Sequence, residues 1–254
     1  MFKNLHIPSV LKIFGLSILL FFSIGFGENR QSDKVCEQIV VAIDYQYDNY
    51  FVDKDEVMDL MTVGGTRNLI GNWWVHLDLK EIEKRVMGHH FIKKAEVYRD
   101  LEGNMLVEVN QKRPIARIIR NGVNQAYISD EGEILPVSKK FTARVVLISG
   151  DYGSELVKSK QVNQTLEGKL MDLLRFIDED EFWKAQVSEV NIDRKGNVIL
   201  YPQVTKQYIE FGDLNNLTHK FDKLKIFYQD ILPQKGWNYY TKVNLKYQDQ
   251  IICE

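Results

Sequence analysis

Residues 92–116 read IKKAEVYRDLEGNMLVEVNQKRPIA, and this stretch decides the fold class. Two runs rich in apolar and β-branched residues, Ile92–Arg99 and Met105–Val109, predict strands. The DLEGN segment between them carries the Asp, Gly and Asn that turns favour, so the two strands should form a hairpin. Arg113-Pro114 then predicts a domain boundary, because the residue before a proline is pushed out of helical conformation.

Upstream of this hairpin the sequence predicts one strand and two helices. β-branched residues within positions 35–45 favour a strand. Asp53 and Asp78 each have a glutamate three residues later, which is the pattern of a capped helix N-terminus, and Gly88 is suited to end the second helix. Residues 36–113 are therefore expected to form one domain in the order β-α-α-β-β.

Downstream of the boundary, short β-rich runs alternate with turn residues. Strands are expected at Ile115–Ile119, Ala126–Ile128, Val145–Ile148, Val187–Ile192, Val198–Tyr201, Gln207–Phe211 and from Lys242 to about Cys253, with helices at Gln164–Ile177 and Asn215–Tyr228. The acidic run Asp178–Glu181 is expected to be a solvated turn. Residues 114–254 thus predict a β-rich domain with an antiparallel sheet and flanking helices, and the whole chain belongs to the α+β class.

The N-terminal region predicts a membrane anchor. Residues 10–27 read VLKIFGLSILLFFSIGFG, which is short for a transmembrane helix but sufficient if Lys12 reaches the headgroups. Lys3 and Lys12 lie at the N-terminal side of the apolar run and the charges that follow it cancel, so residues 1–9 are expected in the cytoplasm and residues 28–35 form a linker outside. The alternative is a cleaved signal peptide, for which the small-x-small pattern at residues 23–27 is a weak cleavage site.

The composition argues against nucleic-acid binding and offers no catalytic motif. The formal charge is −2 and the pI about 6.2, so there is no basic field to attract nucleic acid. The sequence holds no motif that would form a catalytic nucleophile, a metal site or a phosphate-binding loop. We therefore expect that the protein is not an enzyme and binds no cofactor, no metal and no small-molecule substrate. His89-His90 is expected to be a structural connector. Cys36 and Cys253 either stay two small buried residues or pair as a disulfide, and the sequence leaves this open.

The order of these elements and several short motifs resemble the FtsQ/DivIB family of bacterial division proteins. Besides Arg113-Pro114, which falls on the family's Arg-Pro, the motifs are AYISDEGEILPVS at 126–138, VVLISG at 145–150, IEFGD at 209–213, KFDKLKIFYQDI at 220–231 and VNLKY at 243–247. The resemblance implies a POTRA module in residues 36–113 and an FtsQ-type β domain in residues 114–254.

The resemblance also implies a function. It implies a single-pass protein of the bacterial cytoplasmic (inner) membrane at the division septum, with its C-terminal domains in the periplasm or outside the cell. There it would be a non-enzymatic scaffold that links early and late divisome proteins. Its partners would be membrane-anchored division proteins of the FtsB and FtsL type, bound outside the cytoplasm.

The expected partner-binding residues lie in the last strand and are Val243, Leu245, Lys246, Tyr247 and Ile251. As the last element, this strand is expected at a sheet edge, where unpaired backbone groups invite a strand from a partner. Tyr247 occupies the position of a partner-contacting tyrosine in the family; the alternative is that Tyr247 is a core residue of an internal strand. Asn244 and Lys246 stand where the family has Asp and Arg, and a lysine cannot form the bidentate bonds of an arginine.

Two other classes remain possible from sequence. An outer-membrane assembly or secretion factor also uses POTRA modules, but it carries several of them and a barrel of amphipathic strands. A secreted hydrolase with an unfamiliar site would show clustered acids or histidines in a pocket.

Overall fold

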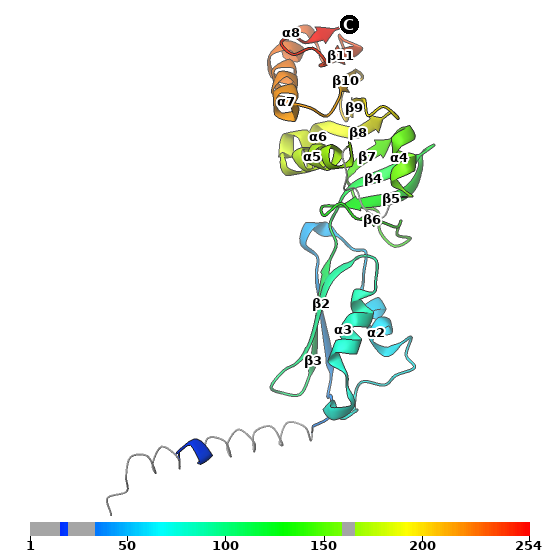
Figure 1. The fold of residues 1–254 in the computed structure, drawn as a ribbon, viewed down its shortest axis with the longest axis vertical. Coiled ribbons are helices and arrows are strands. Elements are labelled where there is room, and N and C mark those ends of the chain that lie inside the picture. The colour runs from blue at the N-terminus through cyan, green and yellow to red at the C-terminus, as the bar shows by residue number, and fades with distance from the viewer. Residues whose placement is uncertain (1–15, 20–33, 159–165) are drawn as a thin grey trace, which may run out of the picture. The chain divides into compact units, whose positions relative to one another are not determined.

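The structure is a computed structural model that describes residues 16–19, 34–158 and 166–254. Its contacts divide the chain into two units (Figure 1). Unit 1 comprises the residues up to 44 together with 52–111, and unit 2 comprises 45–51 together with 112–254. Residues 45–51 lie within the segment predicted for the first domain, yet they pack with the second unit. The sequence-based boundaries 36–113 and 114–254 stay a prediction.

Most of the predicted membrane anchor lies outside the described residues. Within the segment 10–27, residues 16–19 are described and are helical. No helix in the described part of the chain has the length and apolar character needed to cross a membrane. The tail 1–9 also lies outside the description, so the span stays a prediction.

Unit 1 has the predicted β-α-α-β-β order. Its elements are β1 (Ile39–Asp44), α2 (Lys54–Thr62), the 3₁₀ turn η2 (Trp74–His76), α3 (Leu79–Met87), β2 (Ile92–Arg99) and β3 (Met105–Gln111). The strand order is β1-β3-β2, in which β3 runs antiparallel to β2 and parallel to β1. The predicted hairpin is thus confirmed, and the first strand of the unit joins it on the β3 side.

The two predicted helix caps form as expected. Asp53 Oδ1 accepts a hydrogen bond from the Glu56 backbone N–H at 2.9 Å, and Asp78 Oδ1 accepts one from Glu81 at 3.0 Å. These carboxylates satisfy backbone donors that the first turn of a helix leaves unpaired. The helix α2 ends at Thr62, because its C-cap Val63 adopts the left-handed conformation with φ of 55°.

Among the described residues of unit 2, the sheet has nine strands in the order β12-β11-β10-β9-β8-β7-β4-β5-β6. They are β4 (Pro114–Arg120), β5 (Val123–Ser129), β6 (Ile134–Leu135), β7 (Val146–Ser149), β8 (Val187–Ile192), β9 (Val198–Pro202), β10 (Tyr208–Gly212), β11 (Lys242–Asn244) and β12 (Ile252–Cys253). The short strands β12 and β6 form the two edges.

The prediction of an antiparallel sheet was wrong. In the described part of the sheet, three pairings are parallel, namely β4 with β7, β7 with β8, and β10 with β11. A parallel pair needs a long crossover. Helices between β7 and β8 and between β10 and β11 supply two of these crossovers, and the β5–β6 segment supplies the third. The sheet is therefore mixed.

The helices of unit 2 pack on the face of the sheet that carries its apolar cluster. They are α4 (Asp151–Leu156), α5 (Leu166–Glu179), α6 (Glu181–Gln186), α7 (Leu217–Ile226), the π-helical turn η3 (Phe227–Ile231) and α8 (Leu232–Lys235). Leu156 of α4, Leu170 of α5 and Trp183 of α6 belong to the same apolar cluster, and a Cβ added at Gly153 of α4 would lie 3.5 Å from Ile118 and 3.7 Å from Ile148. The sequence did not predict α4 or α6. The acidic run is not a solvated turn, because Asp180 caps α6 and Asp178 contacts Arg113 and Lys184.

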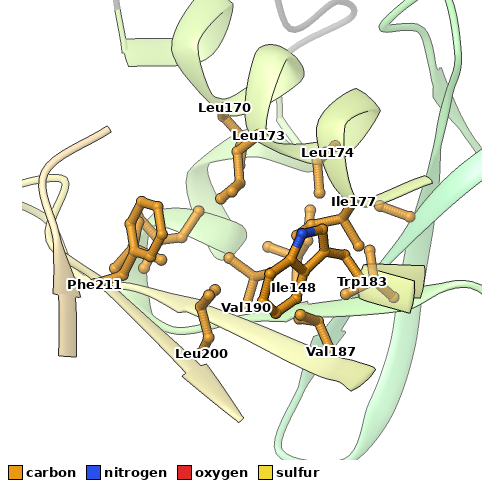
Figure 2. Packing of buried hydrophobic residues seen from close by; sticks show 14 of the residues in the cluster. Ile148, Leu170, Leu173, Leu174, Ile177, Trp183, Val187, Val190, Leu200 and Phe211 are labelled. Carbon is orange, nitrogen blue, oxygen red and sulfur yellow. The ribbon is translucent and has the colours of Figure 1, made fainter. Parts of the chain in front are cut away.

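The core of unit 2 lies between α5, α6 and the strands. Leucines and isoleucines of α5 and Trp183 of α6 pack over residues of β7, β8, β9 and β10 (Figure 2). The same apolar cluster runs from Ile115 on β4 to Leu245 after β11. Burial of this continuous apolar layer is the dominant favourable contribution to folding. The layer also holds the C-terminal strands in the sheet.

The loop 45–51 contributes an aromatic side chain to unit 2. Phe51 is 2% exposed, and its ring packs edge-on against Tyr127 at 5.5 Å and Phe141 at 4.9 Å between centroids. The Arg113 guanidinium lies 4.4 Å from the Tyr47 ring centroid, which is the geometry of a cation–π contact. A segment that precedes the first helix of unit 1 is thus part of the second core.

Truncation of Phe51 should therefore destabilise unit 2. We expect Phe51→Ala to cost about 3–5 kcal/mol, as for other buried aromatic residues, because it leaves a cavity beside Tyr127. Hydrogen exchange followed by mass spectrometry should show faster exchange in β4 and β5. The matched control is Phe91→Ala in unit 1, which should raise exchange in β2 and β3 instead. If Phe51→Ala speeds exchange only in β2 and β3, the assignment of Phe51 to unit 2 is wrong.

Candidate partner-binding surface

The predicted partner-binding residues divide between the core and the surface. Val243 and Leu245 are fully buried in the core cluster of unit 2, and Ile251 is half-buried against it. Tyr247 is 50% exposed, and the Lys246 side chain is 48% exposed. The structure thus leaves Lys246 and Tyr247 open to a partner and gives Val243 and Leu245 to the core.

The last strand is split, which corrects the prediction of one strand from Lys242 to Cys253. The Asn244 side-chain oxygen accepts a hydrogen bond from the Lys246 backbone N–H at 3.0 Å. Such a side-chain bond to the backbone two residues on replaces a strand bond with a turn. The alternation of buried side chains therefore stops at Leu245, and Tyr247 turns to the surface.

Polar contacts fix the position of this turn. Lys246 Nζ lies 2.8 Å from Glu210 Oε2 on β10, and Asn244 Nδ2 donates to the same oxygen at 3.1 Å. The hydrogen bond from Lys246, and the charges of Lys246 and Lys242, hold the pKa of the Glu210 carboxyl below its usual value. The lysine that stands in place of the family's arginine is thus held by one carboxylate of the neighbouring strand.

Gly212 at the end of β10 makes room for that lysine. Its φ is +77°, and a Cβ added there would lie 2.9 Å from the Lys246 Cγ. A side chain at position 212 would be strained by the backbone and would also push Lys246 aside. The glycine of the IEFGD segment therefore has a local physical role at the surface.

The helix α7 contributes basic side chains that the sequence reading missed. Lys223 Nζ donates to the backbone oxygens of Leu245 and Tyr247, and burial together with Lys220 lowers the pKa of Lys223. Lys220 is buried and donates to Asp213 Oδ1 at 2.7 Å. Lys220 and Lys223, three residues apart in KFDKLK, were the available signal, but the oxygens that Lys223 binds lie more than twenty residues away in the sequence.

A hollow of about 430 Å³ lies beside Tyr247. Its walls include His219 and Lys223 from α7, Asp213 after β10, and Lys246 and Tyr247 from the turn. The hollow is open and mostly polar in its lining residues. It joins the exposed part of the predicted site to the surface of α7.

The strand next to this turn is an edge strand. β12 pairs only with β11 in the described sheet, in antiparallel register, with Val243 opposite Cys253. Lys242 and Glu254 exchange both backbone hydrogen bonds, at 3.1 and 3.0 Å. Because antiparallel pairs alternate, the N–H and C=O of Cys253 then face away from β11. The sheet therefore ends on backbone groups that a further strand can bind.

Other candidate chemistry in the described residues is structural. His89 Nε2 lies 3.2 Å from Glu56 Oε1, within unit 1. Cys36 and Cys253 are free thiols, and burial raises the pKa of each. No group of three or more His, Cys, Asp and Glu residues in the described ranges is arranged to hold a metal ion.

Two regions of the chain match known families. Residues 113–254, more than half of the chain, match the family described as "FtsQ/DivIB, C-terminal related". The chain belongs to the FtsQ/DivIB family. Residues 34–110 match the POTRA-like domain, in agreement with the fold of unit 1. The chain is also 20% identical over 203 residues to the cell division protein FtsQ of Geotalea daltonii. The aligned region covers 79% of this chain and 70% of the relative.

Loss of the Glu210 carboxylate should have a pH-dependent cost. The pKa of Glu210 is lowered in the folded state, so its contribution is present above the unfolded pKa, about 4.3, and is lost as the pH falls through the lower folded value. We expect Glu210→Gln to cost up to about 1 kcal/mol at pH 7, because the paired Lys246 is half-exposed.

Urea unfolding at pH 7, 5 and 3 measures this cost. The difference between Glu210→Gln and the unmodified chain should be constant from pH 7 to 5 and shrink at pH 3. Glu179→Gln, which changes an exposed carboxylate at the end of α5, is the control. If the stability difference between Glu210→Gln and the unmodified chain grows as the pH falls, the pKa of Glu210 is not lowered in the folded state.

Proposed function

We propose that this protein is a non-enzymatic cell-division scaffold anchored in the bacterial cytoplasmic membrane by residues 10–27. Residues 1–9 would lie in the cytoplasm and units 1 and 2 outside it, at the septum. Unit 2 binds membrane-anchored division proteins of the FtsB and FtsL type, and the protein thereby links early and late divisome components. Membership in the FtsQ/DivIB family and the similarity to a cell division protein support this proposal.

The observation that carries the proposal is the edge strand β12, together with the exposed Tyr247 in the loop that leads to it. An extended segment of a partner can add to a sheet edge through main-chain hydrogen bonds, while nearby side chains provide specificity. The outward N–H and C=O of Cys253 supply the backbone bonds. Tyr247 supplies an aromatic surface with a polar tip, which buries a large area at low entropy cost.

The anchor explains how so short an edge can bind. Only Ile252 and Cys253 form β12, so few main-chain bonds are available. A span confines the protein and its anchored partners to the same membrane surface. This confinement raises their effective concentration, so that a weak contact in solution becomes a populated one.

A proline at the outward-facing position tests the edge. Cys253→Pro removes an N–H that faces away from β11, so the fold should persist while an added strand loses a donor and meets the ring. We expect binding to an FtsB/FtsL-type partner to fall at least tenfold by titration in membranes. Cys253→Ala, which keeps the N–H, is the matched control and should bind normally. Equal binding by both variants would exclude strand addition at β12.

Truncation of Tyr247 tests the side-chain contact. We expect Tyr247→Ala to weaken partner binding by about 2 kcal/mol if the ring is a hot spot, with little change in the melting temperature, because the ring is half-exposed. Tyr201→Ala removes an exposed tyrosine from β9, which lies three strands away from β12, and should leave partner binding unchanged. Unchanged binding in Tyr247→Ala would remove this residue from the interface. A large fall in its melting temperature would instead indicate a structural role.

A further inference from the structure

Unit 1 exposes apolar side chains on two neighbouring turns. Between α2 and α3, Ile70, Trp73 and Val75 are 47%, 49% and 70% exposed. On the β2–β3 turn, Leu101 is 89% exposed. We call these four residues the apolar patch. Single exposed apolar residues are common on protein surfaces, so their shared position is what matters.

Both turns are hydrogen-bonded to the segment that leads back to the predicted anchor. Val35 and Trp73 form an antiparallel β-bridge, and the Gly71 backbone N–H donates to Cys36 at 2.8 Å. From the other turn, the backbone oxygen of Gly103 accepts from Glu37 at 3.3 Å. The apolar patch therefore lies on the two turns that are bonded to residues 34–37, the segment that leads into β1.

The packing of Trp74 holds the first turn in place. Trp74 is 8% exposed, and its indole N–H donates to the Val35 oxygen at 3.2 Å. The Arg99 guanidinium lies 5.1 Å from the centre of this ring. The Trp73 backbone N–H donates to the side-chain oxygen Oδ1 of its neighbour Asn72 at 3.0 Å. One tryptophan of the pair thus fixes the turn, and the other is left on the surface.

We propose that the apolar patch rests on the lipid bilayer that holds residues 10–27, with Trp73 at the level of the headgroups. This inference rests on the proposed function, because it requires the span. Only residues 28–33 separate the apolar segment from Lys34, and six residues reach about 20 Å when fully extended. Residues 34–37 must then stay close to the membrane surface. Tryptophan is enriched at this interface, since its ring is apolar and its N–H is polar.

The charges near the patch indicate that apolar contact, not charge, drives this docking. The charged residues that flank Val35 and Leu101 in the sequence are Lys34, Glu37, Arg99, Asp100 and Glu102, and their signs are mixed. Such a surface gains little from anionic lipids. Phosphatidylcholine vesicles should therefore be sufficient, and salt should have little effect.

Fluorescence quenching of the full chain in phosphatidylcholine vesicles tests the proposal. Lipids with bromine atoms near the headgroup quench tryptophans at the interface, and aqueous iodide quenches those in water. We expect Trp73→Phe to lower the lipid-quenched fraction about twofold or more, because Trp73 is the exposed indole assigned to the interface. Trp237→Phe is the matched control, since Trp237 is 46% exposed on unit 2, and it should leave that fraction unchanged.

Each other result contradicts the proposal in a distinct way. If alkaline carbonate extracts the chain from the vesicles, the span is absent, and both the anchor and the docking fail. If the chain stays in the vesicles but Trp73→Phe has the lipid quenching of the unmodified chain, the anchor stands and the docking is wrong. If, in that case, iodide quenches the unmodified chain and this quenching is lost in Trp73→Phe, the patch faces water in vesicles that hold no other protein. The patch would then be a surface for a protein partner and not for lipid.

Discussion

The packing of Phe221 is the contact on which unit 2 depends. This residue of α7 is 1% exposed, and its ring lies 4.5 Å from Phe176 of α5, 4.9 Å from Trp183 of α6 and 5.2 Å from Phe211 of β10. One ring thus joins three helices to the sheet. Because Phe221 fixes α7, it also fixes Lys223, whose Nζ holds the backbone oxygens of Leu245 and Tyr247. The exposed tyrosine of the candidate surface is therefore placed by the aromatic core.

Local signals in the sequence were sufficient for unit 1. The helix caps at Asp53 and Asp78 and the hairpin between β2 and β3 depend on residues a few positions apart, so their patterns can be read directly. The β-α-α-β-β order followed from them. Unit 2 was harder, because its parallel pairings join strands that are far apart in sequence and no local pattern specifies them. The antiparallel prediction failed at β7, which lies between β4 and β8.

The candidate surface shows the same division between local and distant causes. Val243 and Leu245, which the sequence placed among the partner-binding residues, are core residues, whereas Tyr247, two positions further on, is half-exposed. Asn244 was a local signal, since a side chain that bonds the backbone two residues on favours a turn. The carboxylate that holds Lys246 comes from β10, and only the fold brings it there. The role of Gly212 was hidden for the same reason.

The short edge strand has a consequence for the specificity of the proposed partner binding. An exposed sheet edge invites pairing with any extended chain, and proteins limit this by keeping edge strands short and placing charges nearby. β12 has two residues, and Lys242 beside it is paired with Glu254 and Glu210. An edge of this kind offers too few main-chain bonds to hold a chance encounter. Under the proposed function, a partner must therefore add side-chain contacts, as proposed at Tyr247, or be confined to the same membrane. In this view, the weakness of the edge is what makes binding depend on the correct partner in the correct place.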